Sequence, residues 1–282
     1  MICLTTDLHH YSLGVNEIQF LRAHGDYTSE VQAGIEYLKL CEKYNVKYTV
    51  YTTGKTFTEE WDQFRPISES PLVEVGGHTY EGLPRGRFSK LWAAMTGSVS
   101  LSHGDSHGSY AKQKKDVRKT ADIIRQRTGK DIVSWRSHGF VYDDNTHEIL
   151  VDMGIKYISD ALDWDNRHPV KLESGLISHP LNVIEDHDHI YHVHRTKELV
   201  AKQRENWPFK DDPTTESYTI EKWADIAEQQ VLNIENSGGV ATILLHPLCM
   251  YTADRFKTFE RMLKVFAQHK TIWACEVGEY VS

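Results

Sequence analysis

The sequence contains no apolar run of about 18 residues, the length that a membrane-spanning helix needs. Its first residues, MICLTTDLHH, hold no basic segment ahead of an apolar one, so we expect no secretory signal and a cytoplasmic protein. Basic residues are fewer than acidic ones, and the formal net charge is -8. This negative charge argues against a nucleic-acid partner. The four cysteines are scattered and form no C-x-x-C pair, so we expect reduced, buried thiols.

Sequence motifs for nucleotide binding and for serine hydrolysis are absent as well. The pairs Gly76-Gly77 and Gly238-Gly239 stand outside any G-x-x-x-x-G-K or G-x-G-x-x-G pattern. No G-x-S-x-G elbow presents a nucleophilic serine. Histidine, in contrast, occurs 16 times in 282 residues and is the one residue type in clear surplus.

Hydrophobic periodicity alternates along the chain between the spacing of strands and the spacing of helices. Strands are predicted at 2–7, 46–54, 72–77, 131–139, 155–160, 175–186 (edge-like), 240–247 and 271–280. Helices are predicted at 31–45, 112–129, 145–154, 219–239 and 255–270. This alternation predicts one α/β domain over residues 1–282, with a largely parallel sheet closed or nearly closed into a barrel. Segments 82–110 and 194–217 do not follow this alternation of strands and helices. They are predicted to be loop insertions that shape a pocket.

Ionisable side chains follow six of the predicted strands. In a parallel barrel the active site lies at the C-terminal ends of the strands, where these side chains would meet. A single histidine after a strand is usually an ordinary turn or core residue, so the convergence of six strand ends is the stronger signal. The groups are Asp7-Leu8-His9-His10, His78-Thr79, Arg136-Ser137-His138, Asp160, Asp186-His187 and His246-Pro247.

This ordered set resembles the motifs of polysaccharide deacetylases with a NodB homology domain, carbohydrate esterase family 4. The resemblance spans about residues 1–277 and implies a distorted (β/α) barrel that removes N- or O-acetyl groups from sugars with one divalent metal. The matching segments are LTTDLHH for the first motif, His78 to Gly82 for H-[ST]-x-x-H, Arg136-Ser137-His138 for R-x-P-[YW], Asp160 with Trp164 for the fourth, and Leu244-Leu245-His246-Pro247 for the fifth.

The resemblance implies a role for each matching residue. Asp7 is expected to be the general base, held in place by Arg136, and His246 the general acid. Asp160 is expected to hydrogen-bond His246 and support its charged form. His9 and His78 are expected to hold the metal. Substrate contacts are expected from four further residues at these strand ends, namely His10, Tyr80, His138 and Trp164.

The metal site departs from the family pattern at two positions. Gly82 stands where the second histidine of the pair belongs, and His9 replaces an acidic ligand. A third ligand is therefore expected from elsewhere: first Asp186 or His187, next His103 or His107, with Asp7 as a further option. Three protein ligands suffice for zinc, and a nitrogen-rich set suits zinc, nickel or cobalt better than magnesium or calcium. In the other interpretation the site binds metal poorly and the protein is not catalytic. Separately, residues 186–194 are open to interpretation as a solvated polar strand or hairpin with incidental histidines.

The prediction from sequence is thus a metal-dependent hydrolase, with zinc as the expected ion. Its expected substrate is an acetylated sugar, oligosaccharide or polysaccharide precursor. The acetyl group that it removes is expected to be N-linked. The alternative is a catalytically silent relative that binds a carbohydrate or a partner protein. A third hypothesis is an amide or imide hydrolase of the same barrel that acts on a small non-sugar substrate.

Overall fold

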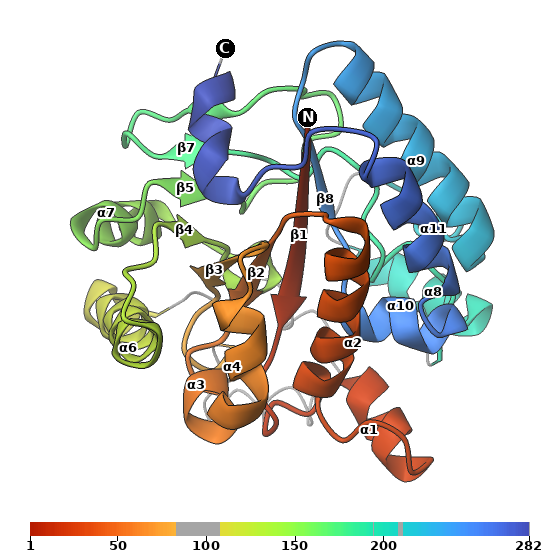
Figure 1. The fold of residues 1–282 in the computed structure, drawn as a ribbon, viewed down its shortest axis with the longest axis horizontal. Coiled ribbons are helices and arrows are strands. Elements are labelled where there is room, and N and C mark those ends of the chain that lie inside the picture. Colours follow the sequence, from red (N-terminus) through yellow and green to blue (C-terminus); the bar gives the residue numbers. More distant parts are fainter. Residues whose placement is uncertain (83–107, 194, 208–210, 282) are drawn as a thin grey trace.

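The computed structural model describes residues 1–82, 108–193, 195–207 and 211–281 (Figure 1). Most of the predicted insertion at 82–110, including His103 and His107, lies outside these residues. Eight strands of the described chain form one sheet. They are β1 (Ile2–Leu8), β2 (Tyr48–Thr52), β3 (Val73–Gly77), β4 (Ser134–Trp135), β5 (Tyr157–Ile158), β6 (Val170–Lys171), β7 (Ile177–Ser178) and β8 (Ala241–Leu244).

The strand order is β6-β7-β5-β4-β3-β2-β1-β8, and all neighbouring pairs are parallel except β6 with β7. The sheet curls into a half-barrel surrounded by helices (Figure 1). The predicted single-domain (β/α) barrel is confirmed in this open form. Within the described residues, strand pairing does not join β8 to β6 and close the barrel.

The open side of β8 is covered by residues 181–186, which do not form a strand. The side chain of Asn182 bridges this seam, because Oδ1 accepts from the Thr242 amide at 2.8 Å and Nδ2 donates to the Val240 carbonyl at 2.9 Å. The backbone amide of Asn182 also donates to the Thr242 carbonyl at 3.3 Å. This contact fixes the segment beside β8 and carries Asp186 to the same end of the barrel as His246.

Helices of the described chain lie around the sheet and confirm the predicted alternation. The α-helices are α1 (Asn16–Ala23), α2 (Glu30–Tyr44), α3 (Thr56–Glu59), α4 (Trp61–Glu69), α6 (Tyr110–Thr128), α7 (Asp144–Asp152), α8 (Lys197–Gln203), α9 (Ile220–Asn236), α10 (Pro247–Asp254) and α11 (Lys257–Phe266). The 3-10 helices are η2 (His138–Phe140), η3 (Arg204–Asn206) and η4 (Ala274–Tyr280). Each described helix is too short or too polar to span a bilayer.

Helix α2 shows how the sequence sets these elements. Its buried residues, including Val31, Tyr37 and Cys41, recur at helical spacing and face the core. The Ser29 side chain accepts from the Val31 amide at the N-terminus. Asn45 ends the helix in the left-handed conformation, with a φ of 53°. The Ser29 cap places Glu30 at the first position of the helix, next to the mouth of the barrel.

Two predicted strands differ from the structure. The predicted strand at 271–280 is wrong beyond its isolated bridge between Ile2 and Thr271, because the chain turns into η4. The Glu276 side chain accepts from the Trp273 amide at 2.9 Å and starts this turn. The predicted edge strand at 175–186 is reduced to β7, which lies between β5 and β6 and is therefore not an edge.

Strand register brings the predicted site residues to one end of the sheet. Asp7 pairs with Tyr51, and Tyr51 pairs with Gly76. Gly77 pairs with Trp135, so the residues that follow each of them, His78 and Arg136, end neighbouring strands at the same level.

The glycine pair of β3 is required by the rings beside it. An added Cβ at Gly76 would lie 2.6 Å from the Tyr51 ring, and one at Gly77 would lie 2.4 Å from the Trp135 ring. Glycine therefore lets both rings pack against β3 immediately before His78.

Candidate active site

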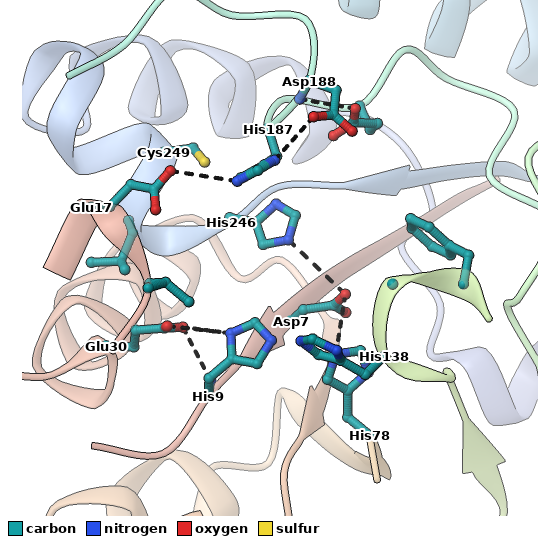
Figure 2. A pocket seen from close by; sticks show the side chains of 15 residues that line it. Asp7, His9, Glu17, Glu30, His78, His138, His187, Asp188, His246 and Cys249 are labelled. Carbon is teal, nitrogen blue, oxygen red and sulfur yellow. Dashed lines mark hydrogen bonds and ion pairs between the residues drawn. The ribbon is translucent and has the colours of Figure 1, made fainter. Parts of the chain in front are cut away.

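A cavity of about 200 Å³ lies at the C-terminal ends of the strands. Figure 2 shows its lining, with Asp7 and His246 in the middle, His9, His78 and His138 on one side, and Glu17, His187 and Cys249 on the other. Asp7 is 5% exposed and His78 is 1% exposed, so the polar groups lie in a largely desolvated space. Electrostatic interactions between them are correspondingly stronger than at the surface.

Asp7 is held by the buried guanidinium of Arg136. Nη1 of Arg136 donates to Asp7 Oδ1 at 2.8 Å, while Nη2 donates to Thr5 Oγ1 at 2.9 Å and to Ser159 Oγ at 2.7 Å. The guanidinium also lies over the Tyr51 ring, 4.5 Å from its centroid. These contacts fix the orientation of the carboxylate and leave its other oxygen for the cavity.

The free oxygen of Asp7, Oδ2, faces two imidazole rings. It lies 3.7 Å from His78 Nε2 and 4.0 Å from His246 Nε2. Burial opposes the charged form, but Arg136, followed by His78 and His246, lowers the pKa of Asp7 well below its usual range. Asp7 is therefore an ionised, oriented proton acceptor at neutral pH.

His246 is paired with Asp186, which corrects two predictions from the sequence. Its Nδ1 lies 2.6 Å from Asp186 Oδ1, and its amide donates to Asp186 Oδ2 at 2.5 Å. Asp186 thus holds the ring of His246 instead of facing the His9 and His78 rings as a third ligand. Burial favours the neutral ring, but Asp186 and then Asp7 outweigh it and raise the pKa of His246 to about 9. The ring carries a proton at neutral pH, as a general acid requires.

Asp160, predicted to support His246, has a different partner. Its carboxylate accepts from the amide and hydroxyl of Ser137 at 2.5 and 3.2 Å. Burial raises the pKa of Asp160 to about 7, although the hydrogen bonds from Ser137 oppose this shift. Asp160 therefore positions the turn that follows Arg136 and leads into His138.

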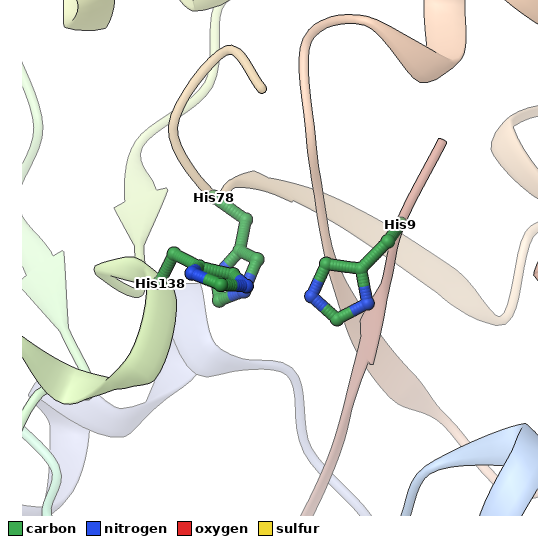
Figure 3. A group of neighbouring side chains, drawn as sticks. All are labelled: His9, His78 and His138. Carbon is green, nitrogen blue, oxygen red and sulfur yellow. The ribbon is translucent and has the colours of Figure 1, made fainter. Parts of the chain in front are cut away.

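Three histidines converge on one side of the cavity (Figure 3). A ring nitrogen from each of His9, His78 and His138 lies within 4.8 Å of those of the other two, as a shared metal ion requires. Their ring centroids are 5.1 to 5.3 Å apart. The third member, His138, was predicted as a substrate contact and not as a ligand.

The outer nitrogens of two of these rings are already engaged. His9 Nδ1 lies 3.0 Å from a carboxylate oxygen of Glu30, and His78 Nδ1 lies 2.8 Å from the Arg136 carbonyl. Both acceptors favour a proton on Nδ1 and so leave the Nε2 lone pairs for the cluster. His9 Nε2 is buried and lacks a hydrogen-bond partner among the described residues. An orphaned nitrogen of this kind fits a metal ligand.

His138 fills the space in front of Gly82. A Cβ added at Gly82 would lie 3.6 Å from two atoms of the His138 ring, and Gly82 has a φ of 75°. At this positive φ, a histidine at position 82 would be strained. The chain supplies the third imidazole from position 138, where the resembled family motif has proline.

The charge state of the cluster suits metal binding. Burial lowers the pKa of His78 to about 4, although Asp7 opposes the shift. Burial, then the rings of His9 and His78, holds the pKa of His138 well below its usual range. Both rings are neutral at physiological pH, which is the form that ligates metals. The three residues therefore fit a divalent ion that prefers nitrogen ligands.

Other predicted site residues lie away from the cluster of His9, His78 and His138. His187 was a candidate third ligand, but its Nε2 lies 3.4 Å from Glu17 and its Nδ1 lies 3.2 Å from Asp188. His10 Nδ1 lies 3.0 Å from the Thr53 hydroxyl. The described lining of the cavity includes neither His10 nor the other two predicted substrate contacts, Tyr80 and Trp164.

Some site residues gave no signal in the sequence. In the sequence, Glu30 stands next to the start of a predicted helix and has no functional signal. Glu17 lies in α1, a helix that was not predicted. Cys249 reads as a scattered core thiol. Each lines the cavity because of a contact between segments far apart in the chain, and such contacts are not visible in local patterns.

Part of the chain matches a known protein family. Residues 28–158 match the family model of polysaccharide deacetylases. This match covers 131 of the 282 residues, a little under half of the chain, and agrees with the family that the motifs predicted. The match supports a hydrolase of the deacetylase type, as the motifs predicted. The matched segment contains His78, Arg136 and His138, while Asp7, His9 and His246 lie outside it.

Solved structures with the same barrel match nearly the whole chain at low identity. A protein from Mycobacterium smegmatis described as a polysaccharide deacetylase is 15% identical, with a TM-score of 0.65 over 98% of this chain and 90% of that one. A protein from Pseudomonas aeruginosa PAO1, described in the same way, is 12% identical, with a TM-score of 0.60 over 96% and 86%. The Puue allantoinase has the same identity, TM-score and coverage. No curated protein matches in sequence.

Proposed function

We propose that the protein hydrolyses an acetyl group from a sugar-linked amine, with a divalent metal bound by His9, His78 and His138. One observation carries this proposal: the ionised Oδ2 of Asp7 lies 3.7 Å from a ring of the histidine cluster and 4.0 Å from the ring of His246. A base, an acid and a metal-type ligand set therefore face one small cavity. Zinc is the proposed ion, because three imidazoles favour it over magnesium or calcium.

When bound, such an ion supplies Lewis-acid polarisation of the acetyl carbonyl and acidifies water. Asp7 accepts the proton of the attacking water at Oδ2, since Oδ1 is held by Arg136. The carboxylate needs no reorganisation, because the guanidinium already fixes it.

His246 completes the reaction at the leaving group. Its Nδ1 is held by Asp186, so Nε2 carries the proton that the departing amine nitrogen needs. The C–N bond breaks as this proton moves to nitrogen, and the products are acetate and the free amine. Asp186 acts through His246 and is a positioning residue.

The family match supports a carbohydrate substrate, and we propose a soluble acetylated saccharide or precursor in the cytoplasm. The barrel by itself does not separate sugars from other amides, because an allantoinase shares it. The test therefore needs both substrate classes.

Metal-loaded protein is incubated with N-acetylated and O-acetylated mono- and oligosaccharides and, separately, with allantoin. Acetate release, free-amine formation and ring-opened product are each measured. We expect acetate release from an acetylated sugar, slowed by about 10²-fold or more in His246→Gln, as for loss of a general acid. His269→Gln changes a partly buried histidine that lies 3.4 Å from Glu235 and does not line the cavity, so this matched control should keep full activity.

Full activity of His246→Gln would contradict its assignment as the acid. Absence of acetate release from the whole panel by protein with stoichiometric metal would favour the silent carbohydrate-binding relative. Ring opening of allantoin without acetate release would favour the small-amide hydrolase.

A further inference from the structure

A second cluster of metal-type side chains borders the cavity on the side away from His9. Glu17, His192 and Cys249 each place a donor atom within 4.8 Å of the other two. His192 Nδ1 lies 3.8 Å from Glu17 Oε1, and Cys249 Sγ lies 4.0 Å from His192 Nε2. Glu17 and Cys249 line the same cavity as Asp7 (Figure 2).

The three residues come from separate parts of the fold. Glu17 lies in the first turn of α1, His192 in the segment after 186, and Cys249 in the first turn of α10. All three are buried, with 3%, 5% and 1% exposure respectively. A carboxylate, an imidazole and a thiol that meet in one buried position offer a transition-metal ion one oxygen, one nitrogen and one sulfur donor.

We propose that Glu17, His192 and Cys249 form a second transition-metal site. One oxygen, one nitrogen and one sulfur donor favour zinc or cobalt, because the thiolate selects softer ions than magnesium or calcium. Binding would release the Cys249 proton as the sulfur becomes a thiolate ligand, so the reaction is exchange of one proton for one ion. The site shares no residue with the His9 cluster, so it does not depend on the proposed function.

His187 borders this group of residues. His187 lies 3.4 Å from Glu17 Oε1 and 3.2 Å from Asp188. With its side chain 45% exposed, His187 is a partly solvated partner for two carboxylates. An ion at Glu17 would supply fixed positive charge there and tie α1, α10 and the segment at 192 together at one wall of the cavity.

Cobalt substitution tests the site, because thiolate ligation gives a near-ultraviolet charge-transfer absorption that histidine and carboxylate ligands do not give. Wild-type protein is depleted of metal, titrated with Co²⁺, and followed by absorption and by bound metal per chain. We expect the charge-transfer band in wild type and its loss in Cys249→Ser, with one fewer ion bound. Cys41→Ser, another buried thiol, is the matched control and should keep the band.

Two further variants separate this site from the first. His192→Gln should weaken the band and the binding of one ion, even if Cys249→Ser were to disturb the fold. His78→Gln should lose an ion and leave the charge-transfer band unchanged. A wild-type protein without the band at saturating cobalt, or a band that persists in Cys249→Ser, would overturn the second site. Neither result would bear on the His9 cluster, which His78→Gln reports.

Discussion

At the residue scale, the pairing of His246 with Asp186 sets the strength of the proposed acid. Burial favours a neutral ring, and the carboxylate 2.6 Å away reverses that preference. The same contact fixes the tautomer, because Nδ1 is occupied and Nε2 is directed toward Asp7. A single carboxylate therefore controls both the charge and the orientation of the ring.

We expect Asp186→Asn to move the alkaline limit of activity to lower pH. His246 must be protonated to act, so kcat/KM in wild type should be lost as pH rises through about 9. Removing the carboxylate takes away the main cause of the raised pKa, so the limit should fall by about one pH unit or more. The measurement is kcat/KM from pH 6 to 10.

Asp160→Asn is the matched control for this profile. Its carboxylate bonds Ser137 and not His246, so the alkaline limit should stay in place. If Asp186→Asn had the wild-type profile, Asp186 would not tune the acid.

The sequence identified most of the residues at the site but not all of their partners. Asp160 and Asp186 both follow predicted strands, and nothing local shows which of them reaches His246 across 60 residues of chain. His138 was visible beside Arg136, yet its place in the cluster depends on how its ring meets those of His9 and His78 across the barrel. Side-chain direction and contacts across the barrel are tertiary properties, so spacing alone does not give them.

At the scale of elements, the seam beside β8 positions the acid. The barrel is not closed there by strand pairing between described residues, and Asn182 supplies hydrogen bonds that a strand would otherwise make. This side chain is 3% exposed and joins β8 to the segment that carries Asp186.

We expect Asn182→Ala to destabilise the protein by about 1 to 3 kcal/mol, because it leaves buried backbone groups of Val240 and Thr242 without these partners. The free energy of unfolding is measured by urea denaturation. Asn233→Ala, on the exposed face of α9, is the matched control and should change it little. Equal unfolding midpoints for the two variants would show that the seam does not depend on Asn182.

Elements with long periodic patterns were predicted well, and the short or terminal ones were not. The predicted helices at 31–45 and 219–239 correspond to α2 and α9, which have regular apolar faces. The residues after 271 have a strand-like composition, yet Glu276 turns them into η4. Helix α10 follows His246 directly and was not predicted, because residue 247 was assigned to the end of a strand.

At the scale of the whole molecule, the site is assembled from distant parts of the chain. Asp7 and His9 follow the first strand, His78 and His138 come from the middle, and His246 lies near the end. A metal at the histidine cluster would join the ends of β1 and β3 to η2 and would bind only the folded barrel. Ligand binding of this kind stabilises the native state by about 3 kcal/mol at a hundred times the dissociation constant.

The proposed metal site depends on His138 as the third ligand beside His9 and His78. The most direct test is elemental analysis of tag-free protein, loaded with zinc and desalted, for wild type, His138→Gln and His10→Gln. His10 is the matched control, because it is a neighbouring buried histidine whose ring bonds Thr53. We expect His138→Gln to lose one equivalent of zinc relative to wild type and His10→Gln to lose none. Unchanged zinc content in His138→Gln would contradict the account.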